Sequence, residues 1–369
     1  MNVPKLRFKE FNDEWCKEYA GNLCSIQTGK SNTQDKTDDG IYPFYVRSPI
    51  IEKSHKFIFD TEAVLTVGDG VGVGKVFHYV NGKFDCHQRV YMMNNFNKIT
   101  AKYFYYIFSR DFDKRVMKMT AKTSVDSVRY EMIDKMQIFY PTVLEQNKIS
   151  RTLELLDKKI ELQSKKIEDL KLFKKGLNKF VFSNCTDEYK IENLIIEYSN
   201  KTTENNQYEV LSSTANGIAF QNEYFNKQAA SNNNTGYKII PKGFITYRSM
   251  SDTGEFHFNI QDITDIGIVS PAYPVFNIKK NLVNKTYFVY YINENDGFKN
   301  EILSTKEGGT RYALSITKFK TLNILLPKIE EQIKYSKYIN IIINKIQLEE
   351  KKFEKLIQLK KGLMQNMFV

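Results

Sequence analysis

The chain carries one long segment twice. Residues 141–182 and residues 327–368 align without gaps at a constant offset of 186. Each copy begins with a proline, has Glu-Gln four residues later, and has the letters KKGL near its end. Because a repeat of this kind indicates a duplicated structural unit, we expect one arrangement of domains to occur twice.

Both copies have apolar residues at alternating spacings of four and three, which is typical of a helix that packs along one seam against another helix. The seam residues are Ile149, Leu153, Leu156, Ile160, Ile167, Leu170, Leu177 and Val181 in the first copy, and Tyr335, Ile339, Ile342, Ile346, Phe353, Leu356, Leu363 and Met367 in the second. Polar residues interrupt the spacing at Gln163 and Lys174 and at the equivalent Glu349 and Lys360. The pattern predicts two helices of about 38 residues, each ~57 Å long at 1.5 Å per residue, preceded by a proline that suits a helix start.

The connection between these helices determines the expected architecture. The first helix ends near Phe182 and a second globular segment begins within a few residues, so that segment must lie at the far end of the first helix from residues 1–140. The second helix must then run back. We predict an α+β fold with two mostly β domains at opposite ends of a long antiparallel two-helix coiled coil, related by a pseudo-two-fold axis. The predicted parts are residues 1–140, 141–182, 183–326 and 327–369.

The two globular segments have matching landmarks. AVLTV at 63–67 matches GFITY at 243–247, YYI at 105–107 recurs at 290–292, and each segment closes with a β-prone run before its helix. Short alternating runs broken by Gly, Asn, Asp and Ser indicate mostly β domains with a few short helices. The loops between the landmarks differ, which suggests two domains that recognise different things.

The glycine-rich stretch VGDGVGVGK at 67–75 raises the alternative of a nucleotide site. A phosphate-binding loop requires glycine, four residues, glycine, lysine and then Ser or Thr, but Asp69 takes the place of the first glycine and Val76 that of the hydroxyl. The dinucleotide fingerprint also fails, because its third glycine would fall on Lys75. We interpret the stretch as a hairpin connection in which glycine supplies positive φ, with Lys75 able to meet a phosphate.

The formal charge of +11 favours a polyanionic partner. Residues 1–140 carry 21 basic and 17 acidic side chains, whereas residues 183–326 carry 14 and 15. The four cysteines lie far apart without a C-x-x-C pair, so neither a disulfide framework nor a zinc site is indicated. No apolar stretch approaches about eighteen residues and no signal core opens the chain. We therefore expect a cytoplasmic protein that does not bind a membrane.

Two similar domains on a spacer of fixed length suit a ligand with repeated contact points along one axis, such as duplex DNA with ~34 Å per turn. Arginine reads guanine edges and Asn or Gln reads adenine, while other polar side chains contact phosphates. The candidate contacts in the first domain are Arg47, Lys75, His87, Gln88, Arg89, Lys122, Thr123, Ser124 and Arg129. The candidates in the second domain are its only two arginines and their neighbours, Arg248, Ser249, Arg311 and Tyr312.

Several stretches resemble the specificity subunit of type I restriction-modification systems. They are PKLRFKEFNDEWCKEYAGNLCSIQTGKS at 4–31, the helix starts YPTVLEQNKISRTLELLDKKI and LPKIEEQIKYSKYINIIINKI, and ANGIAFQNEYFNKQAASNNNTGYKIIPKGFITYRS at 215–249. The resemblance spans the whole chain. The second helix departs from the pattern of the first, because Asp157 is matched by Ile343 and Ile149 by Tyr335. We therefore expect the contacts of the second helix with partner proteins to differ from those of the first.

The resemblance implies a non-catalytic protein whose two target recognition domains read the two halves of a split, asymmetric target in double-stranded DNA, with the helices setting the gap. It also implies two methyltransferase subunits and restriction subunits that translocate DNA as partners. S-adenosylmethionine, ATP and Mg²⁺ would be bound by those partners, so this chain itself would need no cofactor.

The sequence also argues against chemistry by this chain. None of the eight prolines is followed by proline, cysteine or aspartate, which removes the usual adenine-methylating loop, the cytosine-methylating loop and a common nuclease motif. Two alternatives stay open. A coiled-coil adaptor that binds proteins would have no salt-dependent affinity for DNA, and an enzyme with a nucleotide site at 68–75 would melt at a higher temperature with ATP.

Overall fold

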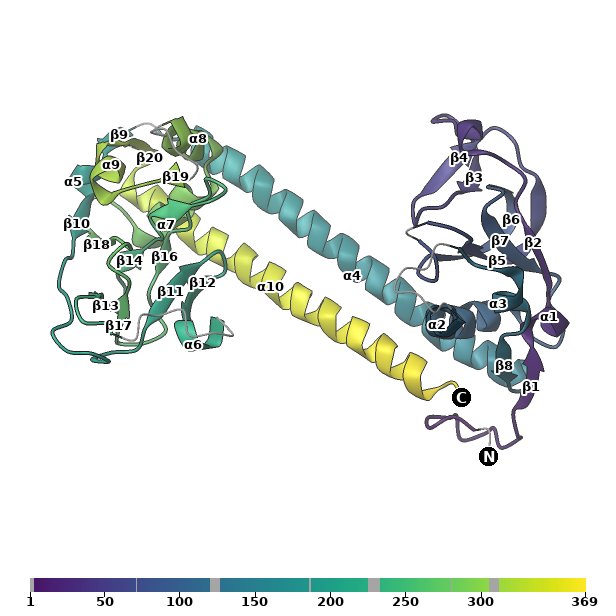
Figure 1. The fold of residues 1–369 in the computed structure, drawn as a ribbon. Coiled ribbons are helices and arrows are strands. Elements are labelled where there is room, and N and C mark those ends of the chain that lie inside the picture. Colours follow the sequence, from purple (N-terminus) through teal and green to yellow (C-terminus); the bar gives the residue numbers. More distant parts are fainter. Residues whose placement is uncertain are drawn as a thin grey trace. The chain divides into compact units, whose positions relative to one another are not determined.

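The computed structural model describes residues 3–70, 72–119, 127–185, 187–224, 233–279, 281–304 and 312–369 (Figure 1). The chain divides into two compact units, Met1–Lys165 with Glu350–Val369 and Lys166–Glu349. We call these the first unit and the second unit. Each contains one globular part and a stretch of both long helices.

The globular part of the first unit is built on a six-stranded sheet with the order β2-β7-β5-β6-β3-β4. Its strands are β2 (Ser25–Thr28), β3 (Tyr42–Tyr45), β4 (Ile51–Ser54), β5 (Phe59–Val67), β6 (Phe77–Cys86) and β7 (Val90–Asn94). Neighbouring strands are antiparallel, except that β3 and β6 run parallel. The last five residues of β5 are all buried, so both faces of this strand are covered, which explains a continuous apolar run in place of alternation.

Helix α2 (Ala101–Met119) supplies much of the core of the first unit. Phe104, Phe108 and Phe112 recur every four residues and therefore share one helix face, where all three are fully buried. The remaining elements are the antiparallel pair β1 (Cys16–Tyr19) and β8 (Gln137–Tyr140), the helices α1 (Ala20–Leu23) and α3 (Tyr130–Asp134), and the 3₁₀ turn η1 (Thr33–Asp35).

The second unit has a four-stranded sheet with the order β10-β18-β14-β16. These strands are β10 (Ile195–Glu197), β14 (Ile245–Thr246), β16 (Asn259–Ile260) and β18 (Val275–Ile278). Four antiparallel pairs surround the sheet: β9 (Asp187–Lys190) with β20 (Asn323–Leu326), β11 (Leu211–Thr214) with β12 (Gly217–Phe220), β13 (Lys238–Pro241) with β17 (Ile266–Val269), and β15 (Met250–Ser251) with β19 (Tyr312–Ala313). The helices of this globular part are α5 (Ile191–Leu194), α6 (Gln221–Tyr224), α7 (Lys285–Glu294), α8 (Asp296–Ser304) and α9 (Ile316–Thr321).

The two globular parts share one strand order. The series β2-β7-β5-β6 in the first unit corresponds to β10-β18-β14-β16 in the second. Strands β5 and β14, which carry the matched stretches 63–67 and 243–247, take the same place in their sheets. Strands β8 and β20 each pair with the first strand of their unit and each lead into a long helix. The prediction of one α+β fold that occurs twice is confirmed.

The long helices are α4 (Val143–Ser183) and α10 (Ile329–Asn366), with 41 and 38 residues. Each begins two residues after its proline, and a buried glutamine holds each start in place. In the first unit, the Gln146 side chain donates to the carbonyl oxygens of Pro141 at 2.9 Å and Lys98 at 3.0 Å and accepts from the N–H of Thr100 at 2.8 Å.

The second unit repeats this arrangement at the start of α10. Gln332 donates to the carbonyl oxygen of Pro327 at 2.8 Å and accepts from the N–H of Asn284 at 2.9 Å. Asn284 caps α7, just as Thr100 precedes α2. The repeated glutamine therefore ties each long helix to the main helix of the globular part from which it leaves.

Every residue of the two predicted apolar seams is buried or half-buried. The charged residues that interrupt the seams form ion pairs. Glu349 lies 2.9 Å from Lys166 in the second unit, and Lys360 pairs with Asp157 in the first. Ion pairing thus explains how charged side chains are tolerated within an apolar pattern.

The mismatch between Asp157 and Ile343 has a structural counterpart. Lys360 and Lys174 occupy equivalent positions of the repeat. Lys360 forms an ion pair with Asp157, but the residue equivalent to Asp157 in the second copy is the uncharged Ile343, which cannot pair with Lys174. Lys174 instead lies 2.8 Å from Glu294 at the end of α7. The second helix is therefore a modified copy of the first, and the second globular part supplies the missing charge.

Each long helix ends in a core. Phe368, two residues beyond the end of α10, is 3% exposed and packs on Tyr103 of α2 in the first unit. Arg110 also donates to the main-chain oxygen of Val369 at 2.8 Å. Phe182, at the end of α4, packs on Tyr291 of α7 in the second unit. These equivalent anchors join the long helices to both globular parts.

Candidate nucleic-acid interface

The glycine-rich stretch connects β5 to β6, which pair antiparallel up to Thr66 and Phe77. Gly70 and Gly74 have φ of 80° and 70°, a region that favours glycine. The N–H groups of Val73 and Val76 donate to Gly70 and Gly72 within the loop and are not directed to a ligand. The hairpin interpretation is confirmed, and Lys75 is exposed on the loop.

Three segments that are distant in sequence meet where this loop leaves β5. The N–H of Gly68 donates to the carbonyl oxygen of Arg89 at 2.8 Å, and its own carbonyl oxygen accepts from the N–H of Val128 at 2.7 Å. An isolated bridge joins Asp69 to Ser127. The structure thus brings three predicted contact regions together: the glycine loop, the turn after β6 and the segment before α3.

Asp69 lies between two of the predicted arginines. Its Oδ1 accepts from Nη1 of Arg47 at 3.2 Å and its Oδ2 accepts from Nη1 of Arg89 at 3.1 Å. The carboxylate side chain is 17% exposed, against 48% for Arg47 and 62% for Arg89. We call Arg47, Asp69 and Arg89 the arginine cluster.

His87 lies beneath this cluster and is only 5% exposed. Its Nδ1 accepts from the main-chain N–H of Arg89 at 3.0 Å. Burial lowers the pKa of the His87 imidazole, and the positive charge of Arg47 lowers it further. The geometry gives His87 the role of holding the turn that carries Arg89.

Gln88 is exposed and faces a neighbouring loop. Its Nε2 donates to Oδ1 of Asn32 at 2.7 Å, and its N–H donates to the carbonyl oxygen of Ser31 at 2.9 Å. A pair of side-chain amides of this kind has the donors and acceptors that an adenine edge requires.

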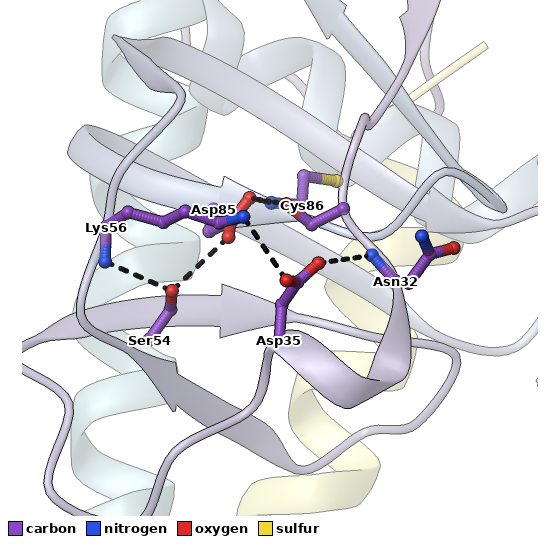
Figure 2. A network of polar contacts seen from close by, with 7 residues as sticks. Asn32, Asp35, Ser54, Lys56, Asp85 and Cys86 are labelled. Atoms are coloured by element: carbon purple, nitrogen blue, oxygen red, sulfur yellow. Dashed lines mark hydrogen bonds and ion pairs between the residues drawn. The ribbon is translucent and has the colours of Figure 1, made fainter.

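A buried carboxylate supports this turn from below. Asp85, which is fully buried at the end of β6, accepts from Oγ of Ser31 at 2.7 Å. It also accepts from the N–H of Cys86 at 2.8 Å and from Oγ of Ser54 at 3.3 Å (Figure 2). Three hydrogen bonds satisfy a carboxylate that burial would otherwise penalise.

The loop that carries Asn32 is held by a second carboxylate. Asp35 accepts from the N–H of Asn32 at 2.8 Å and from Nζ of Lys56 at 3.3 Å (Figure 2). Asp35 therefore holds Asn32, which in turn accepts from Gln88.

The other candidates of the first unit are less closely grouped. Arg129 is exposed before α3, and its Nη2 donates to the carbonyl oxygen of Met119 at 3.4 Å. Lys122, Thr123 and Ser124 lie outside the described residues.

The second unit presents Arg248 and Ser249 shortly after β14, with the buried Tyr247 between the strand and Arg248. The carbonyl oxygen of Ser249 accepts from the N–H of Leu314 at 2.9 Å. This bond is similar to the one between Gly68 and Val128. Leu314 follows Val128 by the repeat offset of 186, whereas the match of 63–67 with 243–247 places Ser249 opposite Asp69, one residue beyond Gly68. Tyr312 is half-buried and pairs with Ser251 in the β15–β19 ladder, whereas Arg311 lies outside the described residues.

Arg248 is exposed and borders a cleft of about 270 Å³. The residues that line it are Ser212, Ser213, Thr214, Ala215, Arg248, Met250, Ser251, Asp252, Thr253, Glu255, His257 and Tyr273. Hydroxyl groups beside one arginine can form hydrogen bonds to phosphates or base edges.

Three residues of the first unit were missed by sequence reasoning: Asn32, Asp69 and Asp85. In the sequence, Asp69 is visible only as a mismatch to a phosphate-binding loop. The serines of β11 were missed in the second unit. No local pattern marks these residues, because their partners lie on other strands.

In the described part of the chain, no group of three or more His, Cys, Asp and Glu residues could hold a metal ion. Across the same residues, no helix has the length and apolar character needed to cross a membrane.

The fold and its loop clusters define a duplicated α+β protein in which exposed arginines lie beside the ends of the matched strands β5 and β14. The family model for the type I restriction modification DNA specificity domain matches residues 12–172 and again residues 187–358. The chain belongs to this family, that of the type I restriction-modification specificity subunits, and carries the DNA specificity domain twice.

Two curated relatives are similar in sequence. The specificity subunit of the type I restriction enzyme EcoDI from Escherichia coli is 25% identical over 185 residues, which are 49% of this chain and only 40% of that subunit. The specificity subunit of the type I restriction enzyme MjaVIII from Methanocaldococcus jannaschii is 22% identical over an alignment of 410 positions that covers 97% of this chain and 94% of that subunit.

Solved structures share the fold. The S subunit of a type I restriction-modification system from M. genitalium superposes with a TM-score of 0.68 at 16% identity, covering 100% of this chain and 99% of that one. A chain from a structural study of the assembly and conformational transition of the type I R-M system gives a TM-score of 0.52 at 13% identity, covering 98% and 99%.

Proposed function

We propose that this chain is the non-catalytic DNA-recognition subunit of a type I restriction-modification enzyme. Residues 1–140 and 183–326 would read the two halves of a split, asymmetric target in double-stranded DNA, and the long helices would set the gap between them. One observation carries the proposal. The loops that follow the matched strands β5 and β14 are tied by similar main-chain bonds, Gly68–Val128 and Ser249–Leu314, but present different side chains, as expected of two domains that read different sequences.

The proposed contacts follow from exposure. In the first unit, Arg47 and Arg89 would read guanine, Gln88 with Asn32 would read adenine, and Lys75 and Arg129 would meet phosphates. In the second unit, Arg248 would read a base beside the hydroxyls of its cleft. A good bidentate contact contributes about 1–3 kcal/mol of discrimination. Lys122, Thr123, Ser124 and Arg311 stay predicted contacts.

Apolar residues exposed on the long helices support two equivalent partner sites. Leu155, Leu162 and Phe173 on α4 recur at the repeat offset as Ile341, Leu348 and Leu359 on α10, and all six are between 51% and 62% exposed. A repeated apolar surface suits two copies of one partner. We propose that two methyltransferase subunits dock there and supply S-adenosylmethionine.

Restriction subunits would bring ATP and Mg²⁺ to the complex, which would act on DNA in the cytoplasm. The family match favours this function over a protein-binding adaptor.

The experiment is to express the chain with the methyltransferase subunit of its own system and to map methylated adenine in the host DNA. We expect one split motif with two different halves and a fixed gap. Arg89→Gln should alter one half and Arg248→Gln the other. A complex that assembles and binds S-adenosylmethionine but methylates no motif would overturn the proposal in favour of the adaptor.

A further inference from the structure

We infer that Asp69 is a specificity-determining residue of the first unit, acting through Arg47 and Arg89. This inference rests on the proposed function. A carboxylate on a surface that meets DNA repels phosphates, so its presence between two exposed arginines requires a reason. The geometry of the arginine cluster supplies one.

The position of Asp69 is fixed by the main chain. Gly68 is bonded on one side to Arg89 and on the other to Val128, and Asp69 itself bridges to Ser127. The carboxylate is less exposed than either guanidinium, at 17% against 48% and 62%. A rigid acceptor thus lies beneath two long, flexible side chains and orients both of them.

Each arginine keeps donors for DNA. A guanidinium has five N–H groups. In the described contacts, Arg47 donates one of them to Asp69 and Arg89 donates one of its own to the same carboxylate. The remaining N–H groups can form bidentate contacts to a guanine edge, which depend on direction.

The carboxylate also changes the charge of the cluster. Two guanidinium groups with one carboxylate carry one net positive charge in place of two. Attraction to phosphates depends on charge and is independent of sequence, whereas base contacts depend on geometry. Asp69 therefore weakens sequence-independent binding to DNA while it keeps both guanidinium groups oriented. The consequence is greater discrimination between target and non-target sequences.

The test uses the complex of the full chain with its methyltransferase subunit. Two duplexes are compared: one with the motif found by methylation mapping, and one with the half read by the first unit scrambled. For Asp69→Asn we expect tighter binding to the scrambled duplex and a discrimination ratio about ten-fold lower. The slope of log K against log salt on the scrambled duplex should steepen by about 0.9, the value for one additional phosphate contact.

Three further variants separate the causes. Asp60→Asn removes an exposed carboxylate of β5 with the same change in net charge, and should leave the ratio and the slope as in the wild type. Asp69→Glu keeps the charge but moves the acceptor, so it should lower the ratio at an unchanged slope. In an Arg47→Gln/Arg89→Gln background, Asp69→Asn should have no further effect on the ratio.

The inference is overturned if Asp69→Asn leaves the ratio unchanged, if it weakens both duplexes equally, or if Asp60→Asn steepens the slope as much. Failure of the proposed function would be distinct, because the wild-type complex would then not discriminate between the duplexes at all.

Discussion

Lys166 of α4 and Glu349 of α10 form an ion pair of 2.9 Å in which the glutamate side chain is only 4% exposed. The lysine side chain is 50% exposed. Breaking a fully buried pair costs about 3–5 kcal/mol, and because half of this lysine is in water we expect Lys166→Met to lower the free energy of unfolding by about 1–3 kcal/mol. The loss in free energy of unfolding is measured from the shift in the midpoint of urea unfolding.

The double variant Lys166→Met/Glu349→Leu is the control. It should recover wild-type stability or exceed it, because an apolar pair completes the seam. If the single variant unfolds at the wild-type midpoint, the pair does not contribute to stability.

The glutamines at the two helix starts should differ in their effect. Gln146→Leu leaves three polar groups without their partner, and Gln332→Leu leaves two. An unsatisfied buried group costs about 1–3 kcal/mol, so both variants should melt at lower temperature and Gln146→Leu at the lowest. Gln347→Leu, the same change at an exposed position of α10, should melt within about one degree of the wild type. Equal melting for all three variants would contradict a role for these bonds.

Two phenylalanines should separate stability from partner binding. Phe368 is 3% exposed in the core of the first unit, whereas Phe173 is 62% exposed on α4. Truncating a buried phenylalanine costs about 3–5 kcal/mol, so Phe368→Ala should lower the melting temperature by several degrees. Phe173→Ala should melt like the wild type and instead bind the methyltransferase subunit at least ten-fold more weakly, as measured by titration calorimetry. A stable Phe173→Ala protein with unchanged affinity would exclude this part of α4 from the interface.

His87 should make the first unit sensitive to acid. Its Nδ1 accepts a hydrogen bond, so the imidazole must be neutral, and burial lowers its pKa in the folded protein. A histidine with a lowered folded-state pKa binds more protons when unfolded. Its contribution to stability is present above the unfolded value of about 6.5 and is lost as the pH falls through the folded value.

The measurement is the melting temperature between pH 7 and pH 5. We expect His87→Asn, whose amide oxygen can accept the same bond without titrating, to show a weaker dependence than the wild type. The exposed His55, which is paired with Asp39, provides the control, since His55→Asn should keep the wild-type dependence. Parallel curves for all three proteins would refute the role of His87.

Much of the architecture could be predicted because local sequence patterns specify its helices and hairpins. The apolar spacing from Ile149 to Val181 identified one helix face, and its repeat identified the second helix. Strand-prone runs on either side of glycine identified the hairpin of β5 and β6. Even the polar interruptions at Glu349 and Lys360 were visible, although their partners were not.

The arginine cluster depended on long-range pairing. Arg47 follows β3, Asp69 follows β5 and Arg89 precedes β7, and these residues meet only because β6 joins β3 to β5 and the backbone of Gly68 bonds to Arg89. A sequence shows which residues repeat and at what spacing, since helices and hairpins are set by neighbours along the chain. Which strands lie side by side is set by burial summed over a whole sheet, and that sum placed Asp69 between the two arginines.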